Sequence, residues 1–156
     1  MIPTFQIELH SRDLPLLKKI QSFFGVGSIS VRQRDNQVIY TVRSLNDLTD
    51  LIIPHFDKYP LLTKKRADFL LFKSVLELIN QKEHLTMEGL AKILSIRASM
   101  NNGLTQILME SFPNITPVPR PVVSDQGIKD PNWLAGFSFP PPLWSLDLIL
   151  LNLAGG

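Results

Sequence analysis

Residues Ser28–Arg43 read SISVRQRDNQVIYTVR, and this stretch decides the fold that the rest of the chain must match. Apolar and polar residues alternate on both sides of Asp35-Asn36, a pair that suits a tight turn. The pattern predicts an antiparallel hairpin of Gly27–Arg34 and Gln37–Arg43, with one apolar face and one polar face. Ile39 is the exception, because it falls on the polar face.

The segments on either side of this hairpin fit the same sheet. Thr4–His10 (TFQIELH) alternates strictly and predicts a third, half-buried strand. Helical spacing of apolar residues follows in Leu14–Phe24 and again in Asp47–Phe56. We therefore expect an α+β fold, an antiparallel sheet covered on one face by helices. Its predicted core residues are Phe5, Ile7, Leu9, Ile29, Val31, Val38, Tyr40 and Val42.

The second half of the chain changes in character. Helical patterns run through Lys64–Gln81 and Met87–Ile96, and Met100–Phe112 is interpreted as one more helical segment. Repeated prolines from Pro113 onward predict an extended linker over residues 113–130, after a domain over residues 1–112. Residues 131–156 form the remaining part, ending in the apolar tail Leu143–Gly156.

Composition excludes several kinds of site. The 156 residues are 44% hydrophobic and 19% charged, which indicates a globular protein. Without cysteine the chain has no disulfide, no thiolate metal ligand and no cysteine nucleophile. The three histidines have no metal-ligand spacing, and Leu143–Leu153 is too short to span a membrane. Lysines and an arginine gather in residues 58–73, which suggests a polyanion partner or only a solvated helix start.

Several stretches, taken in order, resemble one protein family. They are FQIELH, DLPLLKKIQSFFGVGSI, VRSLNDL, HFDKYPLLTKK, KEHLT, IRASMN, FPNI and finally WLAGFS at Trp133–Ser138. Together they are similar to one repeat of the LAGLIDADG homing endonucleases encoded in fungal mitochondrial introns, over residues 3–138. The resemblance implies paired αββαββα units whose sheets lie in the DNA major groove. It also implies that each signature helix ends in an acid that binds Mg²⁺-type ions.

The chain departs from that pattern at both signature positions. We expect the first signature helix, its acid and the first strand to be missing, since the chain begins after them. The second signature is interrupted, because its acidic position falls on Pro141. A truncated repeat of this kind would have no catalytic residue, no metal ligand and no cofactor, although intact members use Mg²⁺. It would also leave a three-stranded sheet with an open edge that a partner chain could cover.

The polar strand face supplies the candidate binding residues, and the resemblance adds two lysines beside the phosphates. Arginine and amide side chains on such a face suit phosphates and base edges, although a solvated sheet face would look the same. The candidates are Thr4, Gln6, Glu8, His10, Ser28, Ser30, Arg32, Arg34, Gln37, Thr41, Arg43, Lys64 and Lys65.

The expected function is that of a mitochondrial nucleic-acid-binding remnant, with double-stranded DNA as its partner and without cleavage activity. One alternative is an RNA-facing role, like that of a maturase or of a structural component of a ribonucleoprotein such as the mitochondrial ribosome. A further alternative is half of a two-chain DNA endonuclease.

Overall fold

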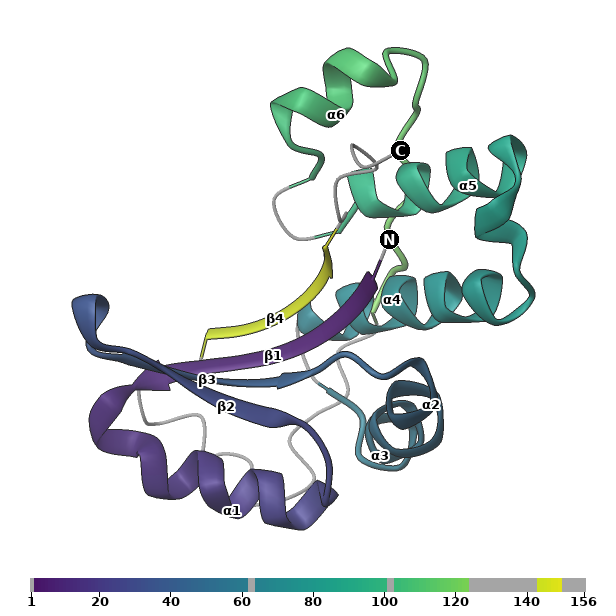
Figure 1. Cartoon of the computed structure of the whole chain (residues 1–156). Helices are drawn as coiled ribbons and strands as arrows, with labels where there is room; N and C mark the ends of the chain where they lie inside the picture. Colours follow the sequence, from purple (N-terminus) through teal and green to yellow (C-terminus); the bar gives the residue numbers. More distant parts are fainter. Residues whose placement is uncertain (1, 62–63, 101–102, 124–142, 150–156) are drawn as a thin grey trace. The chain divides into compact units, whose positions relative to one another are not determined.

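The computed structural model describes residues 2–61, 64–100, 103–123 and 143–149 (Figure 1). The chain divides into two compact units. The first holds Met1–Lys58 together with Asp125–Gly156, and the second holds Tyr59–Ser124. The interrupted signature at residues 133–142 lies outside the described residues.

The first unit contains an antiparallel sheet in the order β2-β3-β1-β4. Strand β1 is Ile2–His10, β2 is Ser28–Arg32 and β3 is Gln37–Val42. The predicted hairpin is confirmed, with Val31 opposite Val38. A 3-10 turn at Gln33–Asp35 joins its strands, and Asn36 takes the left-handed conformation at φ 51°.

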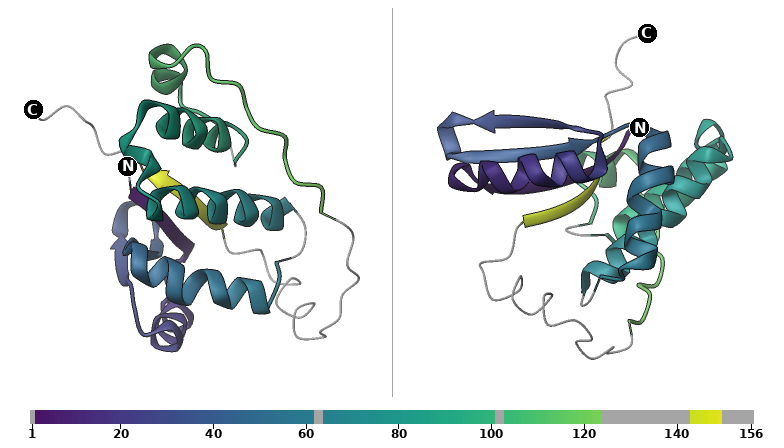
Figure 2. Two further views of the ribbon diagram at one scale, coloured as in Figure 1. Left: turned by 90° about the vertical axis from the view of Figure 1, so that its right-hand side faces the viewer. Right: turned by 90° about the horizontal axis from the view of Figure 1, so that it is seen from below.

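Helices cover one face of the sheet, which confirms the α+β class. Helix α1, Leu14–Phe24, lies along the strands and stays in front of them when the sheet is seen from below (Figure 2, right). The buried core on this face includes Phe5, Ile7, Leu17, Val38, Tyr40 and Val42. The prediction that Val31 is buried was wrong, since its side chain is 54% exposed, and Leu9 and Ile29 are only half-buried. Val31 lies on the outer strand β2, which has a neighbouring strand on one side only.

The predicted helix after the hairpin is present but irregular. The Ser44 hydroxyl caps its start by accepting from the Asp47 N–H at 3.3 Å. The helical path then runs through α2 (Leu45–Asp47), a π-helical turn at Leu48–Ile52 and α3 (Ile53–Lys58). Pro54 has no N–H to give to the carbonyl four residues earlier, so the regular ladder cannot continue through this point.

The apolar tail corrects one expectation about the sheet. Leu143–Ile149 forms strand β4, which pairs antiparallel with β1. The described sheet therefore has four strands, and the edge of β1 that we expected to be open is covered. Local spacing could not indicate this pairing, because β4 and its partner β1 lie more than a hundred residues apart in the sequence.

The second unit is helical. It contains α4 (Lys64–Asn80), a 3-10 turn at Glu83–Leu85, α5 (Met87–Ala98) and α6 (Gln106–Ser111). The expected single helix over residues 100–112 was too long, because Gly103 has φ 78° and the chain becomes helical again only at Gln106.

The proline-rich segment beyond α6 is tied to the helices of its own unit. Val118 donates its N–H to the Ser95 carbonyl at 3.1 Å, and the Ser99 hydroxyl donates to the Val118 carbonyl. Arg120 Nη1 lies 2.8 Å from Asp68 Oδ1 on α4 and 2.7 Å from the Ser99 carbonyl oxygen. Residues 118–120 therefore pack against the helices of their own unit and form a strap.

Candidate nucleic-acid interface

The sheet face that α1 leaves uncovered carries three rows of side chains across β1, β3 and β2. Opposite residues of antiparallel strands share a face, so the strand register defines each row. The rows are Gln6–Thr41–Ser28, Glu8–Ile39–Ser30 and His10–Gln37–Arg32. The sequence thus assigned these nine residues to the correct face.

Their exposure decides which of them can reach a ligand. His10, Ser28, Ser30 and Arg32 are exposed, and Gln6, Glu8, Thr41 and Gln37 are half-buried. Ile39 is only 3% exposed, so it fills the middle of the face rather than contacting a partner.

Thr4 must be removed from the candidate residues. Its side chain is 0% exposed, and its hydroxyl donates to the Ile2 carbonyl at 3.4 Å. Thr4 lies on the inner strand β1, where β4 pairs alongside and places Asp147 opposite it. The alternation identified its face but could not reveal this burial.

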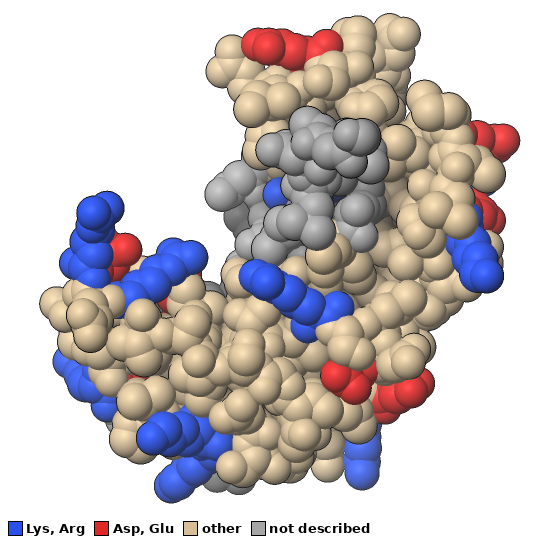
Figure 3. All heavy atoms as spheres, viewed as in Figure 1, with Lys and Arg blue, Asp and Glu red and all other residues tan. Residues whose placement is uncertain are grey.

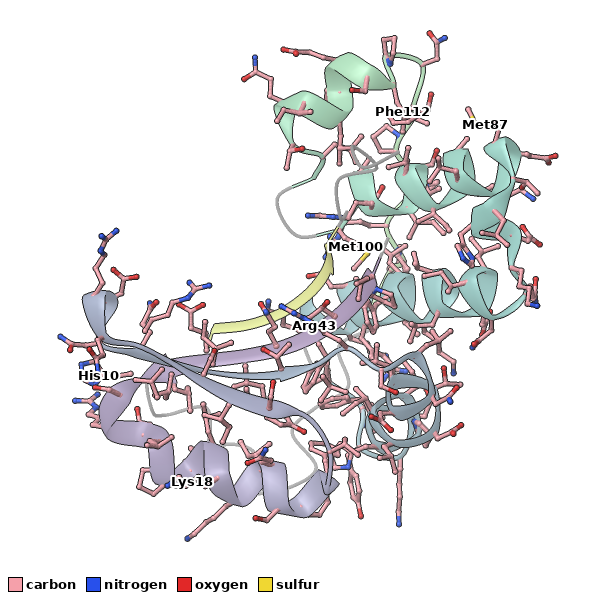
Figure 4. The ribbon with its side chains drawn as sticks, in the orientation of Figure 1. His10, Lys18, Arg43, Met87, Met100 and Phe112 are labelled. Atoms are coloured by element: carbon pink, nitrogen blue, oxygen red, sulfur yellow. The ribbon has the colours of Figure 1, made fainter. Side chains whose placement is uncertain are left out.

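Three arginines provide the positive charge of this region. Arg32 is the last residue of β2, and Arg43 directly follows β3. Arg34 was predicted on a strand but lies in the 3-10 turn at the hairpin tip. All three are exposed, and none forms an ion pair with another residue that the structure describes. Figure 3 shows basic side chains, drawn in blue, projecting from the hairpin end, and Figure 4 shows Arg43 on the side of the sheet opposite Lys18 of α1.

His10 has a local role in addition to its place in the third row. Its Nδ1 accepts the Arg12 N–H at 3.2 Å and so caps the turn that follows β1. Tyr40, on the core face, donates its hydroxyl to the Val26 carbonyl at 2.7 Å. This bond positions the start of β2 and therefore Ser28 of the first row. Burial, with the nearby Asp47 charge, raises the pKa of Tyr40 to about 12.

The two candidate lysines belong to the other compact unit. Lys64 begins α4, but its side chain lies outside the described residues. Lys65 follows it and is exposed. The structure therefore assigns the lysines and the sheet rows to separate units.

Sequence reasoning missed an aromatic cluster on the helix-covered side. The His55 ring meets Phe23, Phe24 and Phe56 edge to face, with ring centroids 5.0–5.4 Å apart. A cavity of about 360 Å³ lies among these rings and Phe5. Burial lowers the pKa of His55, which favours its neutral form. The signal available in the sequence was the pair Phe23-Phe24 in one predicted helix and the pair His55-Phe56 in the next.

Within the described ranges, no three histidine or acidic side chains come together in a way that could hold a metal ion. None of the helices that the structure describes is both long and apolar enough to cross a membrane.

Comparison with known proteins finds relatives described as intron-encoded endonucleases. The profile of the family described as LAGLIDADG endonuclease matches residues 1–76. A probable intron-encoded endonuclease 3 of Neurospora crassa is 48% identical over 135 residues, covering 85% of this chain and 25% of that protein. A probable intron-encoded DNA endonuclease aI1 of Mycosarcoma maydis is 30% identical over 92 residues, covering 58% of this chain and 75% of that protein.

Solved structures agree with this assignment. The structure of I-SmaMI bound to an uncleaved DNA target in the presence of calcium ions has a TM-score of 0.83 and 46% identity. The match covers 87% of this chain and 46% of that one, so the chain spans less than half of the solved protein. It also spans only a quarter of the Neurospora relative. The matching sheet, helices and sequence show that this chain belongs to the LAGLIDADG endonuclease family.

Proposed function

We propose that the chain binds double-stranded DNA through the uncovered face of its sheet. The observation that carries this proposal is the set of three exposed arginines, Arg32, Arg34 and Arg43, beside rows of amide and hydroxyl side chains. Without intramolecular carboxylate partners among the described residues, these guanidinium groups are available to phosphates or guanine edges. The DNA bound to the similar I-SmaMI structure supports the choice of duplex DNA.

The rows suit the major groove, which admits a two-stranded antiparallel ribbon. Arg32 and Arg43 have the guanidinium groups that pair with guanine, and Gln6 and Gln37 have the amide groups that pair with adenine. Most of the affinity should come from phosphate contacts and should fall steeply with salt. Lys65 of the second unit is proposed to add to this phosphate binding.

We propose that the chain does not cleave DNA by itself. Two-metal phosphodiester hydrolysis needs protein carboxylates that hold the ions beside the reacting oxygens. At the position where the resemblance places such an acid, the sequence has Pro141, which offers no side-chain oxygen. The later acid Asp147 lies in β4, opposite Thr4 of β1. No reaction step is assigned to these residues.

The proposed cellular setting is the mitochondrion. Its support is the group of fungal relatives described as intron-encoded endonucleases, including the Neurospora protein. An RNA-facing role remains the second candidate, since arginines on a sheet bind RNA phosphates as well.

A titration with DNA and RNA tests which nucleic acid the chain binds. The purified chain is titrated into fluorescent duplex DNA of random sequence and into RNA duplex of the same length, and anisotropy is followed at several salt concentrations. The proposal expects tighter binding to DNA than to RNA. Tighter binding to RNA would favour the ribonucleoprotein role.

Cleavage is tested on plasmid DNA with Mg²⁺ or Mn²⁺. The proposal expects the plasmid to stay intact. Site-specific double-strand cleavage that is lost on Asp147→Asn would show that the chain supplies a catalytic acid and would overturn the proposal.

A further inference from the structure

The outer edge of β1 is occupied by a segment from the far end of the sequence. Strand β4 pairs with β1 from Ile2 opposite Ile149 to Glu8 opposite Leu143. Seven of the nine residues of β1 are paired in this way. Figure 1 shows β4 running alongside β1 on the side away from β3. The edge is thus covered along most of its length.

The sequence of this segment matches the register in which it binds. Its residues read LWSLDLI, so apolar and polar residues alternate from Trp144 to Leu148, with one further apolar residue at each end. Trp144 and Leu146 lie opposite Ile7 and Phe5, both of which are core residues that are 1% exposed. Ser145 lies opposite Gln6 on the polar face. A slip of one residue would set Ser145 and Asp147 opposite buried residues of β1, so the alternation favours this pairing.

An uncovered β1 edge would destabilise the sheet and favour association with another strand. Its unpaired N–H and C=O groups would lie beside the core residues Phe5 and Ile7 and would offer a template for another strand. Strand addition satisfies those groups, and pairing at alternate positions provides selectivity.

We propose that the β1 edge is a strand-binding site whose occupant is Leu143–Ile149 of the same chain. In this arrangement the tail seals the sheet and prevents two copies from joining edge to edge. The site is independent of DNA binding, because it concerns the edge of the sheet rather than its polar face.

The cysteine-free sequence permits a direct test by cross-linking. Residues paired across antiparallel strands have Cα atoms about 4.5–5.5 Å apart, which is within the range of a disulfide. The double variant Gln6→Cys/Ser145→Cys is compared with Gln6→Cys/Leu146→Cys, in which the second cysteine is shifted by one residue. Mild oxidation is followed on non-reducing gels and by intact-mass measurement.

The proposal expects an intramolecular disulfide that forms at least about tenfold faster in the paired variant than in the shifted one, given the narrow geometry of the bond. Equal rates in the two variants would show that the register does not exist in solution. A cross-linked dimer as the main product would show that the strand comes from a second copy. Either result would overturn the proposal.

Proline substitutions provide a second test of sealing. Successive N–H groups of an edge strand point alternately toward its neighbour and toward solvent, and proline is tolerated only where the N–H faces solvent. Among Ser145→Pro and Leu146→Pro, one variant should therefore release the edge and form dimers or larger species in light scattering, while the other stays monomeric. If both variants stay monomeric with the β1 amides still protected from hydrogen exchange, the tail does not seal this edge.

Discussion

The Tyr40 hydroxyl donates a 2.7 Å hydrogen bond to the backbone carbonyl of Val26. Tyr40 is fully buried on the core side of β3, and Val26 lies in the short connection between α1 and β2. The bond therefore fixes the point at which the chain leaves its covering helix and enters the outer strand. The position of β2, and with it the row that ends at Ser28, depends on this contact.

Removal of that hydroxyl should weaken the hairpin without altering its shape. Tyr40→Phe keeps the ring but leaves the Val26 carbonyl without this donor, so we expect a loss of about 1 kcal/mol in the free energy of unfolding. Urea denaturation followed by tryptophan fluorescence or circular dichroism measures it. Tyr59→Phe is the matched control, because Tyr59 is 57% exposed and its variant should change stability much less.

The same tyrosine predicts how stability depends on alkaline pH. The folded-state pKa of Tyr40 is about 12, raised above the ordinary value of 10 by burial. Its contribution is therefore fully present below pH 10 and is lost as pH rises toward 12. Two pKa units correspond to roughly 2–3 kcal/mol. Between pH 9 and pH 12, the free energy of unfolding should fall less steeply with pH for Tyr40→Phe than for the unchanged protein. Identical slopes for the two proteins would contradict the prediction.

Gly27 should tolerate a side chain less well than Gly25. Both have positive φ, 88° and 71°, so alanine strains the backbone at each position by about 1–2 kcal/mol. A Cβ at Gly27 would also lie 2.6 Å from Tyr40 Cε2 and 2.8 Å from the Thr41 carbonyl oxygen, whereas a Cβ at Gly25 would have no atom within 4 Å. The melting temperature of Gly27→Ala should be clearly lower than that of Gly25→Ala. Equal losses would mean that the Tyr40 ring moves aside without cost.

Local signals in the sequence identified much of the first unit. Alternation gave the faces of β1, β2 and β3, Asn36 marked the left-handed turn, and Ser44 marked a helix start. These features depend on neighbours within a few residues, and so they can be deduced from spacing alone.

The errors concern properties that depend on which strands become neighbours. Val31 is exposed because β2 is an edge strand of the sheet. Thr4 is buried although the alternation of β1 assigns it to the polar face. Strand β4 was missed because its partner β1 lies more than a hundred residues earlier in the sequence.

The strap over the second unit depends on one buried carboxylate. Asp68 is 5% exposed, and Arg120 binds both it and the Ser99 carbonyl. Arg120→Ala removes a charged hydrogen-bond partner from a buried group, so we expect a loss of about 2 kcal/mol in stability. Arg12→Ala serves as the control, because its 3.8 Å pair with Asp13 is exposed and should contribute little. Urea midpoints that shift equally in the two variants would contradict a structural role for the strap.

The last prediction separates binding by the sheet face from general attraction to positive charge. Arg43 and Lys18 are both exposed cations of the first unit, and they lie on opposite sides of the sheet (Figure 4). If the uncovered face binds duplex DNA, Arg43→Ala should weaken binding about fivefold, the equivalent of about 1 kcal/mol, and Lys18→Ala should leave it nearly unchanged.

The slope of the logarithm of affinity against the logarithm of salt concentration adds a second criterion. It should become shallower by about one for Arg43→Ala if that arginine contacts a phosphate, and should stay the same for Lys18→Ala. Circular dichroism of both variants confirms that the fold is retained. Equal losses of affinity in the two variants would mean that net charge, rather than this face of the sheet, attracts the DNA.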